Sequence, residues 1–154
     1  MTELNFFSAT YAEARERFVA AATRCDLDIE SHPHPLIGPQ GEALALHVVR
    51  DGLRRAPRLL IISSGCHGIE GHVGSAVQTA LLSDPAWRAA TREAGVAVLY
   101  LHALNPHGFA WGRRATQENV DLNRNFLDFA QPLPQNAAYD ELAALLVPTH
   151  WPPN

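Results

Sequence analysis

The stretch RLLIISSGCHGIEG, residues 58–71, decides the fold, because an unbroken apolar run leads directly into a glycine-rich segment that carries His67 and Glu70. Residues 58–65 do not alternate between apolar and polar side chains, which is typical of a strand buried on both faces. We therefore expect a central strand here. The segment after it predicts either a ligand-binding loop or a tight turn.

The residues that follow predict a crossover between two parallel strands. Apolar side chains recur at helical spacing over residues 72–83, and Asp84 with Pro85 indicates the end of that helix. A second apolar run, GVAVLYLHAL at 95–104, predicts another buried strand. Because strand, helix and strand form a right-handed crossover, the loops after both strands should lie at the same edge of the sheet, where open α/β sheets bind ligands.

The remaining segments complete an α/β domain. Ser8 or Thr10 can cap a helix over about residues 9–24, and Glu13 would complete a capping box with Thr10. The stretches LDIESHPHPLIG and GEALALHVVRDG predict an edge hairpin, and residues 136–147 predict a further helix. We expect a three-layer sandwich with a mixed, mainly parallel sheet that is incomplete. Such a sheet has an unpaired apolar edge, and we expect either that a second copy of the chain covers it in a homo-oligomer or that the chain is a fragment of a longer protein.

The composition limits the classes of function that the protein can have. The 154 residues are 47% hydrophobic and 18% charged, with a formal net charge of -4, which is typical of a globular domain and argues against a nucleic-acid partner. We expect no signal peptide and no membrane span, and hence a cytoplasmic location. Cys25 and Cys66 are the two cysteines, and we expect small buried thiols instead of a disulfide.

His67 and Glu70 are candidate metal ligands. Two intervening residues can bring an imidazole nitrogen and a carboxylate to one point, and Gly65, Gly68 and Gly71 permit the sharp backbone path of a ligand loop. The alternative is a glycine-rich strand-to-helix turn in which the glutamate caps the helix. Spacing and context alone favour the two interpretations equally.

A second polar segment follows the second strand. VDLNRNF, residues 120–126, places Asn123 and Arg124 together, and this pair offers a planar set of donors suited to a carboxylate. Arg113 and Arg114 lie about ten residues earlier and could face a developing oxyanion. The alternative is an internal ion pair between Arg124 and Asp121 that fixes the loop.

Together, SSGCHGIEG, NPHGF, the Arg-Arg pair and VDLNRNF resemble the zinc carboxypeptidase superfamily, and in particular an uncharacterised bacterial branch of it. The resemblance implies that residues 1–154 form the N-terminal part of a single catalytic domain. It also implies a role for each matched residue: His67 and Glu70 bind zinc, Asp121 orients the histidine, Asn123 and Arg124 hold a substrate carboxylate, and Arg113 or Arg114 polarises the scissile carbonyl, with Arg114 favoured.

The implied activity is zinc-dependent hydrolysis of an amide or peptide bond in a small carboxylate-bearing substrate or at a peptide C-terminus. The family's third metal ligand and general base would fall beyond Asn154, so we expect weak or no turnover from these 154 residues. Within the chain, His102 is expected to be a core residue, His72 to point elsewhere, and His107 to lie in a turn at the site rim. Two alternatives are an aspartoacylase-type deacylase and a non-catalytic carboxylate-binding or assembly domain.

Overall fold

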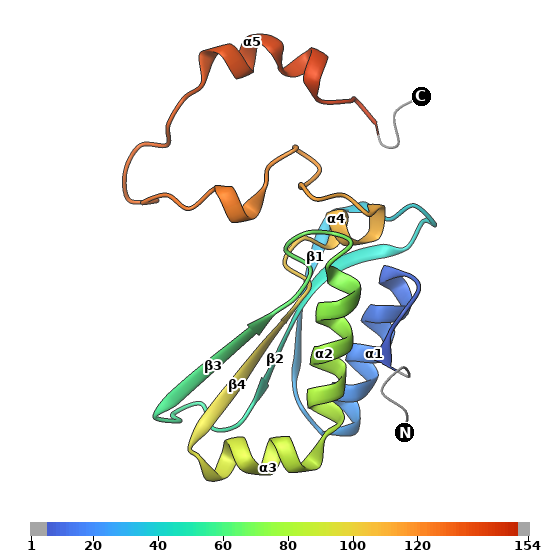
Figure 1. Cartoon of the computed structure of the whole chain (residues 1–154), viewed down its shortest axis with the longest axis vertical. Coiled ribbons are helices and arrows are strands. Elements are labelled where there is room, and N and C mark those ends of the chain that lie inside the picture. The colour runs from blue at the N-terminus through green and yellow to red at the C-terminus, as the bar shows by residue number, and fades with distance from the viewer. Residues whose placement is uncertain (1–5, 151–154) are drawn as a thin grey trace.

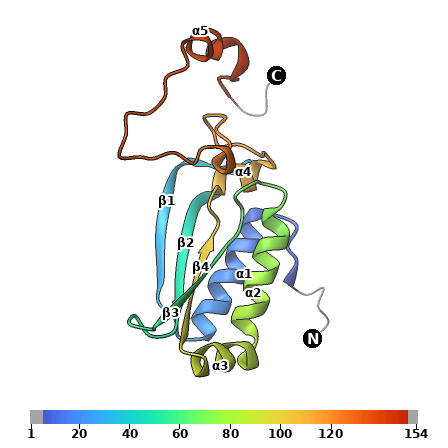
Figure 2. The same cartoon turned by 60° about the vertical axis from the view of Figure 1, so that its left-hand side comes forward.

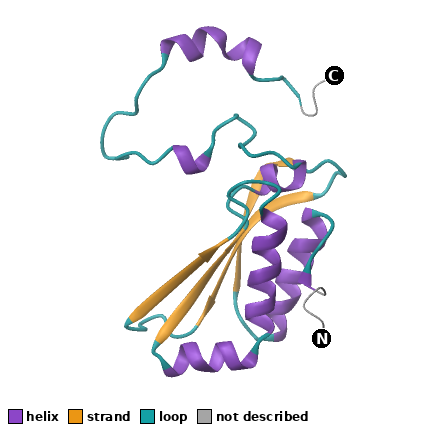
Figure 3. Ribbon diagram, in the orientation of Figure 1, coloured by secondary structure: helices purple, strands orange, loops and turns teal. Residues whose placement is uncertain are grey.

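The structure is a computed structural model that describes residues 6–150. Figures 1 and 3 show a twisted sheet with helices packed beside it and a long C-terminal segment that extends away from it. The elements in chain order are α1 (Tyr11–Arg24), β1 (Ile29–Ile37), β2 (Ala43–Asp51), β3 (Arg58–Ser63), α2 (Gly71–Ser83), α3 (Pro85–Glu93), β4 (Val96–His102), α4 (Pro106–Trp111), the 3-10 turn η2 (Leu122–Arg124) and α5 (Ala137–Leu146).

The sheet has four strands in the order β1-β2-β4-β3. β3 and β4 are parallel, which confirms the predicted crossover through α2. β1 and β2 form the predicted antiparallel hairpin, and β2 also pairs antiparallel with β4. The α/β class and the open, mixed sheet are therefore confirmed. The balance differs from the mainly parallel sheet that was expected, because residues 6–150 contain one parallel pairing and two antiparallel ones.

β3 lies at the edge of this sheet and not at its centre. β4 takes the central place because it pairs with β2 on one side and with β3 on the other. Leu59, Leu60 and Ile61 are between 39% and 55% exposed. An apolar run indicates that a strand needs covering on both faces, but it does not say which segment provides the cover. The predicted second copy over this edge stays a prediction.

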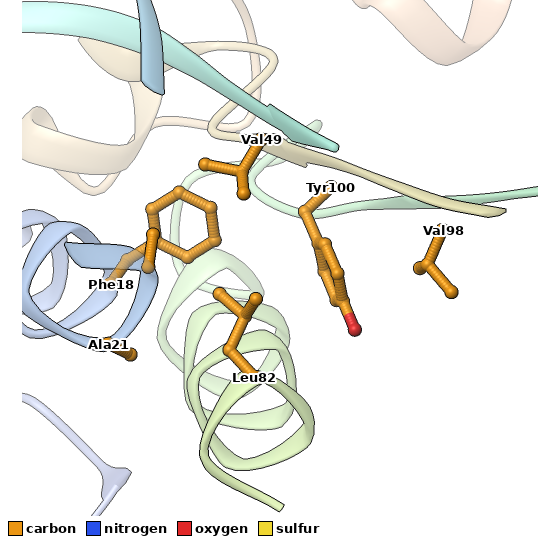
Figure 4. Close-up of a cluster of buried hydrophobic side chains, with 7 residues drawn as sticks. Phe18, Ala21, Val49, Leu82, Val98 and Tyr100 are labelled. Atoms are coloured by element: carbon orange, nitrogen blue, oxygen red, sulfur yellow. The ribbon is translucent and has the colours of Figure 1, made fainter. Parts of the chain in front are cut away.

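The core lies between the sheet and two helices. α1 and α2 lie on the same side of the sheet in Figure 2, so the described residues form two of the three expected layers. Phe18 of α1 and Leu82 of α2 meet Val49 and Tyr100 from the central strands, and all four are fully buried (Figure 4). Burying side chains of this size stabilises the fold by roughly 1.5–3 kcal/mol each.

The first helix begins as the sequence predicted. Thr10 is the N-cap of α1, and its side chain accepts a hydrogen bond from the backbone N–H of Glu13. The Glu13 carboxylate accepts one in return from the N–H of Ala9, so the reciprocal bond of the predicted capping box is made one residue before the N-cap. These two bonds satisfy backbone N–H groups at the start of α1.

A second helix follows α2 where only a helix stop was predicted. Asp84 ends α2 and at the same time caps α3, because its carboxylate accepts hydrogen bonds from backbone N–H groups in the first turn of α3. Pro85 occupies the first position of this helix, where a backbone N–H would have no partner within the helix. Asp51 at the end of β2 then binds Arg88 at 2.5 Å and Arg92 at 2.7 Å. Burial raises the pKa of Asp51, but the two arginine hydrogen bonds outweigh it and lower that pKa below its usual range.

The C-terminal segment holds the predicted last helix, α5. None of its residues is buried, and Figures 1 and 2 show it standing apart from the sheet. Its apolar side chains, among them Leu142 and Leu145, are therefore exposed instead of facing a core. No helix within residues 6–150 is both long and apolar enough to cross a membrane.

Candidate functional site

Two loops meet at the end of the sheet where β3 and β4 finish. The N–H of Leu104 donates to the carbonyl of Ser64, and the N–H of Asn105 donates to that of Gly65, both at 2.9 Å. Gly65 has a φ of +64°, a left-handed conformation that glycine adopts without steric cost. The parallel pairing of the two strands thus continues into their loops, and the predicted meeting of these loops is confirmed.

A second junction lies closer to the candidate ligands. The N–H of Gly68 donates to the carbonyl oxygen of Arg113 at 2.9 Å, and the N–H of Arg113 donates to that of Gly108 at 2.8 Å. A Cβ atom on Gly68 would overlap both of these carbonyl oxygens. The absence of a side chain at position 68 therefore lets the segment that carries Arg113 and Arg114 lie directly against the loop that carries His67.

The imidazole of His67 lies between two carboxylates from different segments. Its Nδ1 is 3.2 Å from Oε2 of Glu70, and its Nε2 is 3.0 Å from Oδ1 of Asp121. His67 is 8% exposed, whereas most of the Glu70 side chain is open to solvent. His67 and Glu70 therefore converge, and a residue 54 positions away along the chain fixes the far side of the ring.

Asp121 is the centre of the cluster. Its carboxylate also accepts hydrogen bonds from Nε of Arg114 and from the backbone N–H of Asn123, each at 2.9 Å. The hydrogen bond with His67 lowers the pKa of Asp121 to about 2, and the contacts with Arg114 and Asn123 add to this against the opposing effect of burial. The carboxylate is therefore ionised at neutral pH.

The side chains of the other predicted residues lie beside this cluster. Arg113 directs its guanidinium to the side-chain oxygen of Asn119, at 3.3 Å. Asn123 and Arg124 form the η2 turn, which Asp121 caps, and Arg124 donates to the carbonyl of Asn123. The alternative of an ion pair between Arg124 and Asp121 is wrong, because Arg114 takes that place.

Neighbouring side chains behave largely as expected. His102 is fully buried, with its Nε2 2.8 Å from the hydroxyl of Ser75, as expected of a core histidine. His72 directs its Nδ1 to the carbonyl of Ser8, away from the cluster. His107 was expected in a turn at the site rim but lies buried within α4. Cys66 and Cys25 were expected to be buried, but both are partly exposed. Partial burial raises the pKa of Cys66, and the charges of Asp121 and Glu70 add to this, so its thiol stays protonated.

The cluster borders a small open pocket of about 160 Å³ lined by His67, Glu70 and Arg114. Imidazole nitrogen and carboxylate oxygen are both good ligands for a divalent cation. Within residues 6–150, no three or more histidine, cysteine, aspartate or glutamate side chains lie close enough to one another to hold a metal ion. The described chain therefore offers two ligands at one point, with a guanidinium beside them.

α4 is the part of the site that the sequence analysis missed, since residues 105–113 were read as a loop. Asn105 caps this helix by accepting a hydrogen bond from the N–H of Gly108 at 2.8 Å, Pro106 occupies its first turn, and Gly112 ends it with a φ of +62°. These three residues form a cap, first-turn proline and C-terminal glycine pattern that could have identified the helix. α4 sets the direction in which Arg113 and Arg114 leave the sheet.

Fold and site together define an α/β protein with a histidine and carboxylate cluster at the carboxyl end of a parallel strand pair. Residues 7–154 match the family described as "Protein of unknown function (DUF2817)", and the chain belongs to that family. A comparison with curated proteins gave no match.

Two solved structures are distantly similar. A glutaminyl cyclase from Porphyromonas gingivalis shares 10% identity over 68% of this chain and 48% of its own, with a TM-score of 0.38. The esterase LipW from Mycobacterium marinum shares 15% identity over 65% of this chain and 29% of its own, with a TM-score of 0.34. The chain thus spans about half of the first and less than a third of the second, and likenesses this weak carry no argument about function.

Proposed function

We propose that this chain carries part of the active site of a zinc-dependent hydrolase that cleaves an amide or peptide bond in a substrate with a free carboxylate, as the resemblance to zinc carboxypeptidases implies. The observation that supports the proposal most directly is the orientation of His67. Its Nδ1 faces Glu70, and its Nε2 is held by Asp121. This leaves one ring nitrogen directed at the only carboxylate of the cluster that no arginine neutralises.

The residues present fit zinc in kind and spacing, though not in number. Two ligands of a tetrahedral zinc ion, bonded at about 2.0–2.2 Å, lie roughly 3.4 Å apart. The 3.2 Å between Nδ1 of His67 and Oε2 of Glu70 is close to that separation. Catalytic zinc sites normally use three protein ligands, so a third would have to come from outside residues 6–150. We therefore expect weak zinc binding by these residues alone.

Asp121 prepares His67 for a metal ion. Because it is ionised, its carboxylate can accept the proton on Nε2, and the lone pair of the imidazole is then on Nδ1, facing Glu70. Such a partner fixes the ring orientation and increases the basicity of the ligating nitrogen. A bound zinc ion would polarise a carbonyl group and activate water for hydrolysis.

Arg114 is better placed than Arg113 to act on the substrate. Asp121 holds its Nε, and Arg114 lines the same pocket as His67 and Glu70. More than half of its side chain is exposed, so its remaining donors can reach a developing oxyanion. Arg113 instead directs its side chain to Asn119. We therefore assign the carbonyl-polarising role to Arg114.

Asn123 and Arg124 are proposed to bind the substrate carboxylate. They follow Asp121 directly in the η2 turn, so they lie next to the residue that contacts His67. A guanidinium presents paired donors that match the two oxygens of a carboxylate. An aspartoacylase-type deacylase would use the same groups, and the two reactions differ in the substrate's leaving group.

A non-catalytic carboxylate-binding domain is the second candidate. The specific observation in its favour is that residues 6–150 bring together two potential metal ligands and no third. Such a domain would bind a peptide C-terminus through Asn123 and Arg124 whether or not a metal is present. Binding of an acylated amino acid that is unchanged by a chelator would favour this function over the hydrolase.

The test of the hydrolase combines metal binding with turnover. Zinc titrated calorimetrically into the metal-free chain should bind at one site, and the loaded chain should hydrolyse N-acetylated amino acids or short peptides, with both properties lost in His67→Ala. The matched control is His32→Ala, because His32 is an exposed histidine that pairs with Glu30 on β1. Zinc binding that survives His67→Ala while His32→Ala abolishes it would place the metal elsewhere and contradict the proposal.

Asp121→Asn should weaken zinc binding by roughly 10–100-fold, because an amide cannot supply the negative charge that orients His67 and strengthens Nδ1 as a ligand. Competition with a chromophoric chelator measures the affinity. Asp128→Asn is the control, since Asp128 accepts a hydrogen bond from the N–H of Ala130 in an exposed turn and, within residues 6–150, makes none with His67 or Glu70. Equal zinc affinities of Asp121→Asn and the unmodified chain would show that Asp121 does not support the metal site.

A further inference from the structure

A second, larger pocket lies at the other end of the sheet from the candidate site. It has a volume of about 520 Å³ and lies where β2 ends and where β3 and β4 begin. In Figure 1 this is the lower end of the sheet, opposite α4. Ligand pockets in proteins typically measure roughly 300–1,000 Å³. The size therefore suits a small organic molecule.

The walls of this pocket are largely apolar, with Leu27, Leu53, Ala56, Pro57 and Val96 among the lining residues. Leu53 is 79% exposed, in the turn between β2 and β3. An apolar wall around a few convergent polar groups is the usual composition of a small-molecule site. The body of a ligand bound here should therefore be apolar.

The charge of the pocket is positive. Three arginines and one aspartate line it, and the aspartate, Asp51, is already paired with Arg92 and with Arg88. Arg50 and Arg55 have no carboxylate partner within residues 6–150. Two guanidinium groups beside the apolar wall are therefore available for an anion.

Arg50 is held in place before any ligand arrives. Its guanidinium donates to the carbonyl oxygens of Leu53 and Arg54, each at 3.0 Å. Its Nε–H is buried and has no hydrogen-bond partner among the described residues. An unpaired buried donor is unfavourable, and an anionic acceptor that reaches it would remove this penalty. A guanidinium fixed in this way also loses little freedom on binding.

We propose that this pocket binds a small organic carboxylate with an apolar body, with the carboxylate on Arg50 and Arg55 and the body against the apolar wall. A planar carboxylate matches the paired donors of a guanidinium. The apolar lining favours an aliphatic or aromatic acid over inorganic phosphate. This site is independent of the proposed zinc chemistry, because it shares no residue with the cluster around His67.

The test is a titration of the isotope-labelled chain with 4-phenylbutyrate, followed by the amide NMR signals of Gly52 and Gly95, which line the pocket. Both signals should shift and saturate. The amide of Gly112, beside the candidate metal site, reports any separate binding of the acid there. 4-Phenylbutan-1-ol, which keeps the body and lacks the charge, should bind at least about tenfold more weakly, as should inorganic phosphate.

Two neighbouring arginines provide a matched pair of variants. Arg55→Gln should weaken 4-phenylbutyrate binding about tenfold, which corresponds to the loss of one charge-assisted hydrogen bond. Arg54→Gln should change it less than about twofold, because Arg54 offers only its backbone carbonyl to Arg50 and its side chain does not line the pocket. Equal effects of the two variants, equal binding of the neutral alcohol, or no saturable shift at Gly52 and Gly95 would each overturn the proposal.

Discussion

Gly68→Ala is expected to separate the loop that carries His67 and Glu70 from the segment that carries Arg114. The new methyl group would overlap the carbonyl oxygens of Gly108 and Arg113, and neither can yield as a flexible side chain would, because both belong to the backbone. Overpacking of this kind typically costs roughly 1–3 kcal/mol. Urea unfolding should show this loss, and zinc affinity should fall by at least about tenfold as Arg114 and Asp121 move away from the loop.

Ile69→Ala is the control for this variant. Ile69 lies in the same loop and is 72% exposed, so its truncation removes little packing and adds no contact. The free energy of unfolding of Ile69→Ala should be almost unchanged. Its zinc affinity should remain within about twofold of that of the unmodified chain. Hydrogen exchange gives a second readout, because the N–H of residue 68 donates to the carbonyl of Arg113 and should exchange faster once that bond is strained. Normal zinc affinity and exchange in Gly68→Ala would show that the junction does not position the site.

The sequence was most informative where a local pattern and the chain's topology agreed. The apolar runs at 58–65 and 95–104, with a helix between them, identified the parallel pair β3 and β4. Parallel strands end at the same edge, so the topology predicted that the two loops meet. The family resemblance implied the contact of Asp121 with His67, which lies 54 positions away along the chain. Capping chemistry was also informative for α1, where the Thr10 side chain accepts from the N–H of Glu13 as predicted, although the Glu13 carboxylate binds the N–H of Ala9 and not that of Thr10.

The sequence was least informative where the outcome depends on which segment covers another. The apolar run of β3 predicted a central strand, but pairing of β4 with β2 places β3 at the edge. The helical spacing of α5 was correct, yet it carried no information about a partner, and α5 buries none of its residues. Three-dimensional neighbours, and not residue type, determine these two outcomes.

The candidate site shows the same limit at the level of single residues. The sequence placed the Arg113–Arg114 pair and Arg124 near the cluster but could not select the partner of Asp121, and the ion pair considered for Arg124 is made by Arg114. The choice depends on α4, whose last turn directs residues 113 and 114 back toward Gly68. Once a helix is inserted between strand and loop, spacing along the chain no longer indicates which side chains meet.

Acid should destabilise this fold strongly, and His102 should account for a large part of the effect. His102 is fully buried, with its ring stacked on Phe18 and Nε2 facing the hydroxyl of Ser75. Burial lowers its pKa to about 3, and the nearby charges of His47 and Arg15 act in the same direction. The unfolded chain, with an ordinary histidine pKa near 6.5, takes up this proton first as the pH falls. The stability is therefore intact above pH 6.5 and is lost progressively toward pH 3.

The expected slope is up to about 1.4 kcal/mol per pH unit for one proton, and a loss of a few kcal/mol by pH 4. Burial also lowers the pKa of His47, and it lowers that of His107 to about 4, so these two histidines add to the slope. Urea unfolding at several pH values between 6.5 and 4 measures the free energy. His102→Gln should remove about one proton from the uptake on unfolding, whereas His32→Gln, at an exposed position, should leave it unchanged. An identical slope for His102→Gln and the unmodified chain would contradict this prediction. It would mean that His102 takes up no additional proton on unfolding, so that burial does not lower its pKa in the folded state.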